Sequence, residues 1–346
     1  MMTKTVTIGG VKIGGGSPIA VQSMTNTRTG DVNATLAQIN ELNDVGCDIV
    51  RCSVPDIDSA TALKKICELS PLPVVADIHF DYKLAMLAAD NGAAKIRINP
   101  GNIGGQDKVD YLASYLKERA IPIRIGVNGG SLDSKYKSLP LDKAMCSSAL
   151  EHVSLLEKAG FYDIVISVKS SDVAATVSCN RLLSASCTYP LHLGVTEAGL
   201  YTSGLVKSSI GIGALLMEGI GDTIRVSLTD NPVEEVSAAK EILKAVNKYD
   251  KPYVEVISCP TCARTEIDVK GLAERIRDRL KDTKRNIKVA VMGCVVNGIG
   301  ESSHCDIGVA GGKHKSAIFK DGKIIETVDN AHIMDRLLQL IEDYGI

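Results

Sequence analysis

The feature that most constrains the fold is a repeat of eight short apolar runs along the first two thirds of the chain. Their spacing leaves room for a strand, a helix and two loops in each unit. In the first intervening segment, Leu36, Ile39 and Leu42 share one helical face, and Gly46 ends the pattern. The eight predicted strands are 19–24, 48–54, 73–80, 95–101, 122–130, 163–171, 191–199 and 223–231.

Eight successive strand–helix units predict an α/β fold of the (β/α)8 TIM-barrel type. A doubly wound sheet is the alternative, but it rarely needs eight units of such even length. Composition agrees with a barrel, because the chain has no Trp and three Phe but is rich in small and branched aliphatic residues. Buried parallel strands favour such residues.

The repeat stops near residues 245–252, and a different order of elements follows. We expect the barrel to occupy residues 1–248 and a small α+β domain to occupy residues 249–346. Its predicted elements are a strand at 253–258, a helix at 268–282, a strand at 287–293, a glycine-rich loop at 294–305, a strand at 306–311, a hairpin at 316–328 and a helix at 331–345.

Charge and composition exclude several classes of protein. The formal net charge is −2 and no basic block occurs, so we expect no nucleic-acid partner. No run of 18 apolar residues indicates a membrane span, and residues 1–16 lack the apolar core of a secretion signal. Ten cysteines without such a signal indicate a reducing compartment, and we expect a cytoplasmic protein.

Basic side chains recur at the ends of the predicted strands. Since strand side chains alternate between faces, the barrel directs one set inward, toward the mouth formed by the carboxyl ends. Arg51, Arg97, Arg124 and Lys169 would repel one another there without an anion. Guanidinium groups bind phosphate oxygens in pairs, so we expect a diphosphate at the mouth. The alternative is that each Arg pairs with a neighbouring Asp or Glu, and His79 by itself is more typical of a structural histidine.

The second domain carries three cysteines with the spacing of a metal site. Cys259 and Cys262 form a CxxC, and Cys294 follows the next predicted strand. A thioredoxin-like pair would not use Cys294. A zinc site would need His304 or Cys305 as a fourth ligand, whereas an iron–sulfur cluster takes three or four thiolates. Spacing alone leaves zinc and iron–sulfur open, and the cysteines assigned a structural role are Cys47, Cys52, Cys67, Cys146, Cys179 and Cys187.

Ten stretches together give the chain a family resemblance. They are VQSMTNT, RCSVP, ADIHF, KIRINPGN, PIRIGVNGGSL, SVKSS, HLGVTEAG, GIGDTIRVSLT, SCPTCAR and VMGCVVNGIGE. In this order, and over nearly the whole chain, they resemble the 4-hydroxy-3-methylbut-2-enyl diphosphate synthases, iron–sulfur enzymes of the methylerythritol phosphate route to isoprenoids. Two residues depart from the family pattern: Ile299 stands where proline is usual, and Ala263 where glycine is usual.

The resemblance implies a reaction and a cofactor. The reaction is the two-electron reductive ring opening of 2-C-methyl-D-erythritol 2,4-cyclodiphosphate to (E)-4-hydroxy-3-methylbut-2-enyl diphosphate, with loss of a hydroxyl as water. The cofactor is a [4Fe–4S] cluster held by Cys259, Cys262, Cys294 and Glu301, and Cys305 is the competing fourth ligand. A ferredoxin or flavodoxin would donate the electrons.

The resemblance also implies roles for residues of the barrel. The residues expected to hold the diphosphate are Arg51, Arg97, Arg124, Asn128, Lys169 and Ser227. Glu197 and Glu301 are the expected catalytic residues, and Arg225 should lie deeper than Ser227. A homodimer with an active site shared between subunits is implied. The alternative from another class is a zinc-stapled barrel lyase or aldolase acting on a phosphorylated substrate, with Lys169 as a Schiff-base lysine.

Overall fold

The computed structural model describes residues 2–136, 138–281, 283–301 and 304–343 of the 346-residue chain. The chain divides into two compact units, Met1–Asp250 and Lys251–Ile346. Each unit has its own hydrophobic core, so each is described by itself.

The first unit is a barrel of eight parallel strands, which confirms the predicted fold class. The hydrogen-bonded order is β8-β7-β6-β5-β4-β3-β10-β9, and a parallel bridge between Ile166 and Leu191 joins the two ends. The strands are β3 (Ala20–Met24), β4 (Ile49–Ser53), β5 (Val74–Asp77), β6 (Lys95–Ile98), β7 (Ile123–Asn128), β8 (Ile164–Lys169), β9 (His192–Leu193) and β10 (Thr223–Ile224).

Two strands are much shorter than the sequence predicts. The runs at 191–199 and 223–231 form only the two-residue strands β9 and β10. Glu197 therefore lies beyond its strand in a loop, and Arg225 and Ser227 follow β10 instead of lying in it. An apolar run marks where a strand begins, but the strand ends where its neighbours stop offering hydrogen-bond partners.

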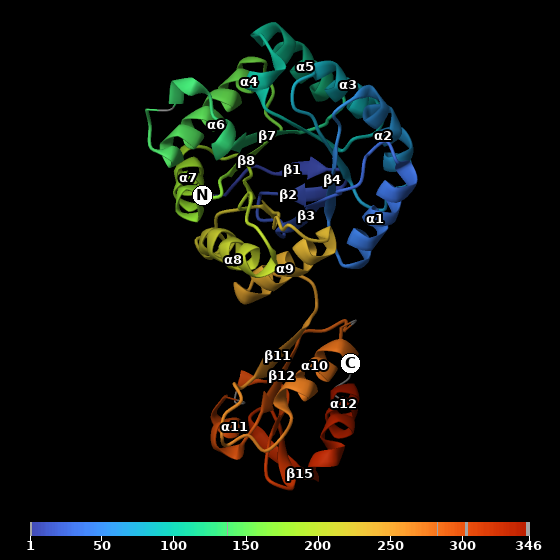
Figure 1. The fold of residues 1–346 in the computed structure, drawn as a ribbon, viewed down its shortest axis with the longest axis vertical. Helices are drawn as coiled ribbons and strands as arrows, with labels where there is room; N and C mark the ends of the chain where they lie inside the picture. Colours follow the sequence, from blue (N-terminus) through green and yellow to red (C-terminus); the bar gives the residue numbers. More distant parts are fainter. Residues whose placement is uncertain (1, 137, 282, 302–303, 344–346) are drawn as a thin grey trace. The chain divides into compact units, whose positions relative to one another are not determined.

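Helices surround the strands as an outer ring (Figure 1). Their apolar faces point toward the sheet, as Ile39 and Leu42 do from α1. Several begin at an aspartate whose carboxylate accepts a backbone N–H of the first turn, for example Asp31 and Asp172. The helices are α1 (Val32–Asp44), α2 (Ile57–Leu69), α3 (Tyr82–Asp90), α4 (Pro100–Ile103), α5 (Gln106–Glu118), α6 (Leu141–Lys158), α7 (Val173–Ser186), α8 (Tyr201–Met217) and α9 (Pro232–Ala245).

A small hairpin that the sequence analysis missed closes the amino-terminal end of the barrel. Strands β1 (Val6–Ile8) and β2 (Val11–Ile13) pair antiparallel around Gly9 and Gly10, which both have positive φ. Apolar side chains of the hairpin pack against the lowest inward residues of four barrel strands, and the cluster consists of Val6, Ile8, Ile13, Ala20, Ile49, Val75 and Val165. Figure 1 shows the hairpin inside the ring of helices. The opposite end is left for polar side chains.

The second unit is a five-stranded mixed sheet. The strand order follows the chain, with parallel pairing from β11 to β13 and antiparallel pairing from β13 to β15. Helices α10 and α12 pack on one face, against Val289, Val291 and Val309. The elements are β11 (Val254–Ser258), α10 (Val269–Arg279), β12 (Ile287–Met292), α11 (Val295–Glu301), β13 (Ile307–Ala310), β14 (Lys315–Lys320), β15 (Lys323–Asp329) and α12 (Ile333–Asp343).

The glycine-rich segment after β12 was expected to be a loop, and its first part is instead the helix α11. Gly298 faces β13 so closely that an added Cβ would lie 2.3 Å from the Cβ of Ala310. The glycine therefore serves close packing of a helix on a strand. It is not a sign of an irregular loop.

Among the described residues, no helix combines the length and apolar character that a membrane span requires.

Candidate functional site

A cavity of about 230 Å³ lies at the carboxyl ends of the barrel strands. It is lined by Arg51, Asp77, His79, Arg97, Arg124, Gly126, Asn128, Ser167, Lys169, Thr196, Arg225 and Ser227. All six residues expected to hold a diphosphate are in this set. The pattern of alternating residues that suggested inward-pointing side chains thus brings them to one pocket.

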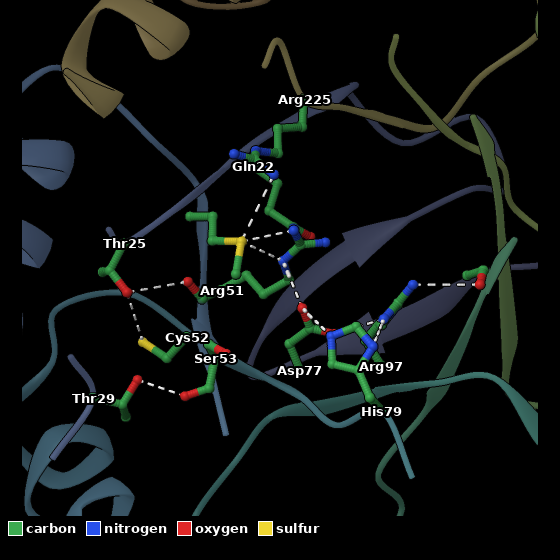
Figure 2. A network of polar contacts seen from close by, with 12 residues as sticks. Gln22, Thr25, Thr29, Arg51, Cys52, Ser53, Asp77, His79, Arg97 and Arg225 are labelled. Atoms are coloured by element: carbon green, nitrogen blue, oxygen red, sulfur yellow. Dashed lines mark hydrogen bonds and ion pairs between the residues drawn. The ribbon is translucent and has the colours of Figure 1, made fainter. Parts of the chain in front are cut away.

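Asp77 at the end of β5 is the centre of the best-connected part of the pocket. Its carboxylate lies 3.0 Å from Nη1 of Arg97, 3.7 Å from Nε of Arg51 and 3.8 Å from Nε2 of His79 (Figure 2). Burial raises the pKa of Asp77, but Arg51 and Arg97 outweigh it, so the pKa lies below its usual value. Asp77 is therefore a buried carboxylate that holds two guanidinium groups in place.

Arg225 has its own carboxylate on the other side of the pocket. Glu235, in the first turn of α9, accepts from Nε at 3.2 Å and from Nη2 at 3.1 Å. The thioether sulfur of Met24 lies 2.7 Å from Nη2 of Arg51 and 3.7 Å from Nη1 of Arg225. Two of the arginines therefore approach the same neutral sulfur, while their carboxylate partners lie on other sides.

Arg124 has no such support. Its side chain on β7 is 1% exposed, and its Nε and Nη1 have no hydrogen-bond partner among the described residues. Burial, and then the charges of Arg51 and Arg97, lower the pKa of Arg124. An arginine still stays protonated in proteins. A buried guanidinium without a partner is costly, so this side chain indicates that the pocket is built for an anion.

Lys169 on β8 also lacks a carboxylate partner among the described residues. Its Nζ lies 3.2 Å from Nε2 of His192, whose Nδ1 lies 3.1 Å from Oγ1 of Thr223. Burial, then Arg225 and Arg124, lower the pKa of Lys169 well below its usual value. Burial, then Lys169, lower the pKa of His192. A neutral His192 accepts a hydrogen bond from the amine and directs it within the pocket.

The charges of the pocket do not balance. Five basic side chains line it, Arg51, Arg97, Arg124, Lys169 and Arg225, and the carboxylates that face them are Asp77 and Glu235. Among the described residues, the difference of five and two is a formal charge of +3 when every basic group, Lys169 included, is counted as protonated. The alternative in which every arginine has its own Asp or Glu holds for Arg225 and is wrong for Arg124.

Three pocket features were not assigned from sequence. His79 was expected to be structural, but its half-exposed ring lines the pocket and lies 3.2 Å from Nη1 of Arg97. Glu235 lies outside any strand, so the strand-end rule did not select it. Lys95 is a fully buried lysine beneath the pocket that donates to Oε1 of Gln22 at 3.4 Å. Lys95 lies two residues before Arg97 on β6, so strand alternation could have predicted that it also points inward.

Glu197, the expected catalytic acid, does not line the cavity. It is exposed and directly follows Thr196, which does line it. Its φ is 52°, a left-handed conformation that is unusual for a glutamate. The other described non-glycine residues with positive φ lie just after helices or in a hairpin turn: Ala120, Asn247 and Asp321. Glu197 alone among them stands at the carboxyl edge of the barrel.

The second unit brings its three cysteines to one edge of its sheet. Strands β11 and β12 run parallel in register, and Cys259 and Cys294 follow their carboxyl ends. The N–H of Cys259 donates to the carbonyl of Val291 at 3.3 Å, and Sγ of Cys259 accepts from the N–H of Gly293 at 3.1 Å. Cys262 lies in the loop after β11, where its N–H donates to Oγ1 of Thr265 at 3.0 Å.

Arg264 was missed by the sequence analysis, although it lies two residues after Cys262. Hydrogen bonds from its backbone and side chain lower the pKa of the Cys262 thiol, and its own pKa is raised by Cys262 and then Cys294. Metal ligands bind as thiolates. Arg264 near Cys262 and Cys294, and the N–H of Gly293 at Cys259, favour thiolates of the kind that hold an iron–sulfur cluster.

The fourth ligand is less closely defined. Glu301 ends α11, which begins directly after Cys294, but its side chain lies outside the described residues. Cys305, the competitor, is 4% exposed in an apolar cluster with Met292, Ala310 and Phe319. The side chain of Ile299 is likewise outside the description. In the described part of the chain, no three His, Cys, Asp or Glu side chains converge on a single metal ion.

Two family models match the chain. The GcpE TIM-barrel domain matches residues 3–240, and the GcpE protein C-terminal domain matches residues 255–343. The chain is 54% identical over 344 residues to the 4-hydroxy-3-methylbut-2-en-1-yl diphosphate synthase (flavodoxin) of Clostridium perfringens, with 98% of each chain covered. It is also 54% identical over 345 residues to the protein of the same name from Clostridium acetobutylicum, and that alignment covers 99% of this chain and 98% of the relative.

Among solved structures, the barrel is similar to 7,8-dihydropteroate synthase from Vibrio fischeri ES114. The TM-score is 0.52 at 11% identity, over 71% of this chain and 99% of that one. At this identity the likeness shows the barrel fold alone.

Proposed function

Because the chain belongs to the GcpE family of 4-hydroxy-3-methylbut-2-en-1-yl diphosphate synthases, we propose that its barrel pocket binds the diphosphate of 2-C-methyl-D-erythritol 2,4-cyclodiphosphate. The enzyme is an oxidoreductase of isoprenoid precursor biosynthesis. It opens the ring with two electrons, breaks one C–O bond to phosphate and releases a hydroxyl as water, which gives (E)-4-hydroxy-3-methylbut-2-enyl diphosphate.

The observation that carries the proposal is the buried Arg124 guanidinium, in a pocket whose formal charge is +3. A cyclic diphosphate supplies acceptors for Arg124 and Lys169, the two cations without a carboxylate. Asp77 keeps Arg51 and Arg97 oriented before the ligand arrives, which lowers the entropic cost of binding. Asn128 and Ser227 add neutral hydrogen-bonding groups at the rim.

The family's cofactor is a [4Fe–4S] cluster, and the surroundings of Cys259, Cys262 and Cys294 fit it. We assign these three thiolates and the carboxylate of Glu301 as its ligands. The bound cluster supplies the two electrons singly. An oxygen ligand is a weaker match for cluster iron than a thiolate, so a ligand set with one carboxylate leaves one iron exchangeable. The family models and the named relatives support this reading and not the alternative, a zinc-stapled lyase or aldolase.

Glu197 is proposed as the group that protonates the departing hydroxyl. Residues held in unusual backbone conformations concentrate at functional sites, and φ of Glu197 is 52° at the edge of the pocket. Its side chain is exposed, so it is accessible to a ligand or to another part of the assembly. If Glu197 is the general acid, the Glu197→Gln enzyme should lose activity but keep its affinity for the substrate.

The proposal also includes an electron donor, a cellular location and an oligomeric state. Relatives named for flavodoxin support flavodoxin as the donor. The ten cysteines of the chain, with no disulfide among the described residues, suit the reducing cytoplasm. We also propose a homodimer whose active site combines the barrel of one protomer with the thiols of its partner. An exposed apolar row on α8, Val206, Ile210 and Met217, offers a surface for such an assembly.

The test of the proposed function is anaerobic purification followed by counting of iron and sulfide and an assay with reduced flavodoxin. Brown protein with about four irons per chain and turnover of the cyclodiphosphate is expected. Colourless protein with one tightly bound zinc would contradict the proposal.

The fourth ligand is tested by comparing Glu301→Ala with Cys305→Ser. We expect Glu301→Ala to lose activity and Cys305→Ser to keep it. Loss of activity in Cys305→Ser alone would overturn the assignment of Glu301.

The shared active site is tested by mixing two inactive chains, Glu197→Gln and Cys294→Ser. Hybrid dimers should recover part of the activity, because each contains one intact combination of barrel and thiols. Confirmed hybrid dimers without activity would exclude the shared site.

A further inference from the structure

Glu235 is a buried carboxylate that no part of the proposed function uses. It lies in the first turn of α9 and is 3% exposed. It accepts four hydrogen bonds: from Nε and Nη2 of Arg225, from the hydroxyl of Ser23 at 3.2 Å and from the N–H of Leu228 at 3.1 Å. The donors come from β3 and from the loop after β10, so one side chain joins three elements of the barrel.

These contacts fix the direction of Arg225. Two of its nitrogens are held by Glu235, in a fork geometry that sets both the position and the plane of the guanidinium. Its Nη1 reaches the Met24 sulfur at 3.7 Å. The bond from the N–H of Leu228 also holds the backbone next to Ser227, another residue of the pocket. Beyond the end of β10 at Ile224, backbone N–H groups of Arg225 and Thr229 bond to Leu193 and Gly199. Glu235 holds the segment between these two bonds at Leu228.

We propose that Glu235 is a positioning residue for anion binding, acting through Arg225 and through the loop that carries Ser227. The inference rests on the proposed function, since it assumes that the pocket binds a diphosphate. Glu235 does not line the cavity and has no contact with the ligand. It keeps Arg225 aimed at the space in which a diphosphate oxygen binds.

A purely electrostatic role makes the opposite prediction. If Glu235 only neutralised charge, its replacement by Gln would make the pocket more positive and tighten the binding of an anion. If it positions Arg225, the same replacement weakens binding, because the amide loses one acceptor and presents N–H groups to a cation. The sign of the change therefore separates the two roles.

The experiment measures the binding of inorganic diphosphate to the full chain by calorimetry. Four proteins form a cycle: wild type, E235Q, R225A and the double variant. E235Q should raise Kd about tenfold, and in the R225A background its effect should fall to the smaller part that the Ser227 loop carries. In the holoenzyme, E235Q should raise KM with kcat little changed, which a loss of folded protein would not produce.

A matched control is E218Q, which weakens an exposed bidentate pair with Arg181 on the same barrel and should leave Kd unchanged. If E235Q does not fold, S23A provides the test instead. It removes one hydrogen bond to Glu235 but no charge, and Kd should rise several-fold. Equal or tighter binding by E235Q, an effect fully retained without Arg225, or an unchanged Kd in S23A would each overturn the inference. Wild-type protein that binds no diphosphate would instead refute the pocket itself.

Discussion

The barrel and the second domain both build their sites from parallel strands, the barrel with side chains of the strands themselves and the second domain with residues that follow the strand ends. In the barrel, charged side chains are buried: Asp77 is 4% exposed and Arg124 is 1% exposed. In the second domain, Cys259 and Cys294 are half-buried and Cys262 is exposed. Ion pairs order the side chains of the barrel site before a ligand arrives. The thiol site lies closer to the surface, in the segments that follow β11 and β12.

This difference in burial determines how much each site costs in folding free energy. Buried like charges destabilise the barrel, and the carboxylates Asp77 and Glu235 offset only part of that cost. Thiols are small and weakly polar, so three of them at a sheet edge cost the fold little. Changes in the barrel pocket should therefore alter stability and binding together, whereas changes in the thiols should alter function alone.

The largest effect is expected from Cys294→Ser. Loss of a direct ligand should lower activity more than about 100-fold, beyond what loss of a supporting residue around a metal costs. The iron content should fall as well, while the melting temperature of the barrel stays unchanged. Activity with reduced flavodoxin, iron counting and calorimetric melting give the three readings.

The control is Cys187→Ser, which changes a half-buried thiol of the barrel that bonds to the Leu183 carbonyl. It should keep both iron and activity. An equal loss of iron in the two variants would contradict the special role of Cys294.

Asp77→Asn should destabilise the barrel by about 3–5 kcal/mol at pH 7, because two buried guanidinium groups lose their carboxylate. The pKa of Asp77 is depressed in the folded state, so its contribution is present above the unfolded pKa of about 4 and is lost as pH falls further. The difference in unfolding free energy between wild type and variant should shrink below about pH 4. A difference that stays constant down to pH 2 would show that the charge of Asp77 is not its cause.

Arg124→Met should change both properties, with tighter folding and weaker binding. Removal of a buried charge without a partner should raise the melting temperature of the barrel, while Kd for diphosphate rises about 10- to 100-fold through loss of charge-assisted hydrogen bonds. Arg181→Met, on the barrel surface, is the control and should change Kd by less than about twofold. A lower melting temperature for Arg124→Met would show that Arg124 is stabilised by the fold itself.

The smallest effect is expected from Gly322→Ala in the hairpin of the second domain. Asp321 and Gly322 both have positive φ, and alanine at φ 72° should cost about 1–2 kcal/mol. Only the unfolding transition of the second domain should shift, because each unit has its own core. Calorimetry resolves the two transitions. A matching shift of the barrel transition would show that the units fold together.

The sequence predicted much of the architecture because it rests on local patterns. The eight barrel strands lie where the apolar runs begin, and the DG pair at residues 321–322 forms the expected turn. The GG pair at residues 9–10 carried the same kind of signal for the missed hairpin. The length of β9 and β10 and the helix α11 could not be read locally, since pairing with neighbours and close packing at Gly298 decide them.

For the site, the sequence alone determined which groups are present: basic residues in alternation at strand ends and three cysteines beside two strands. Alternation and spacing are local properties, so they survive without any knowledge of contacts. Only the tertiary structure decided which cations have a carboxylate. Asp77 reaches Arg51 and Arg97 on the two strands next to its own, and Glu235 reaches Arg225 from α9. Arg124 is left without a protein acceptor among the described residues. That distribution arises from the pairing of neighbouring strands and the packing of α9, which set these side chains side by side and bury them away from water. It turns a list of basic residues into a site for an anion.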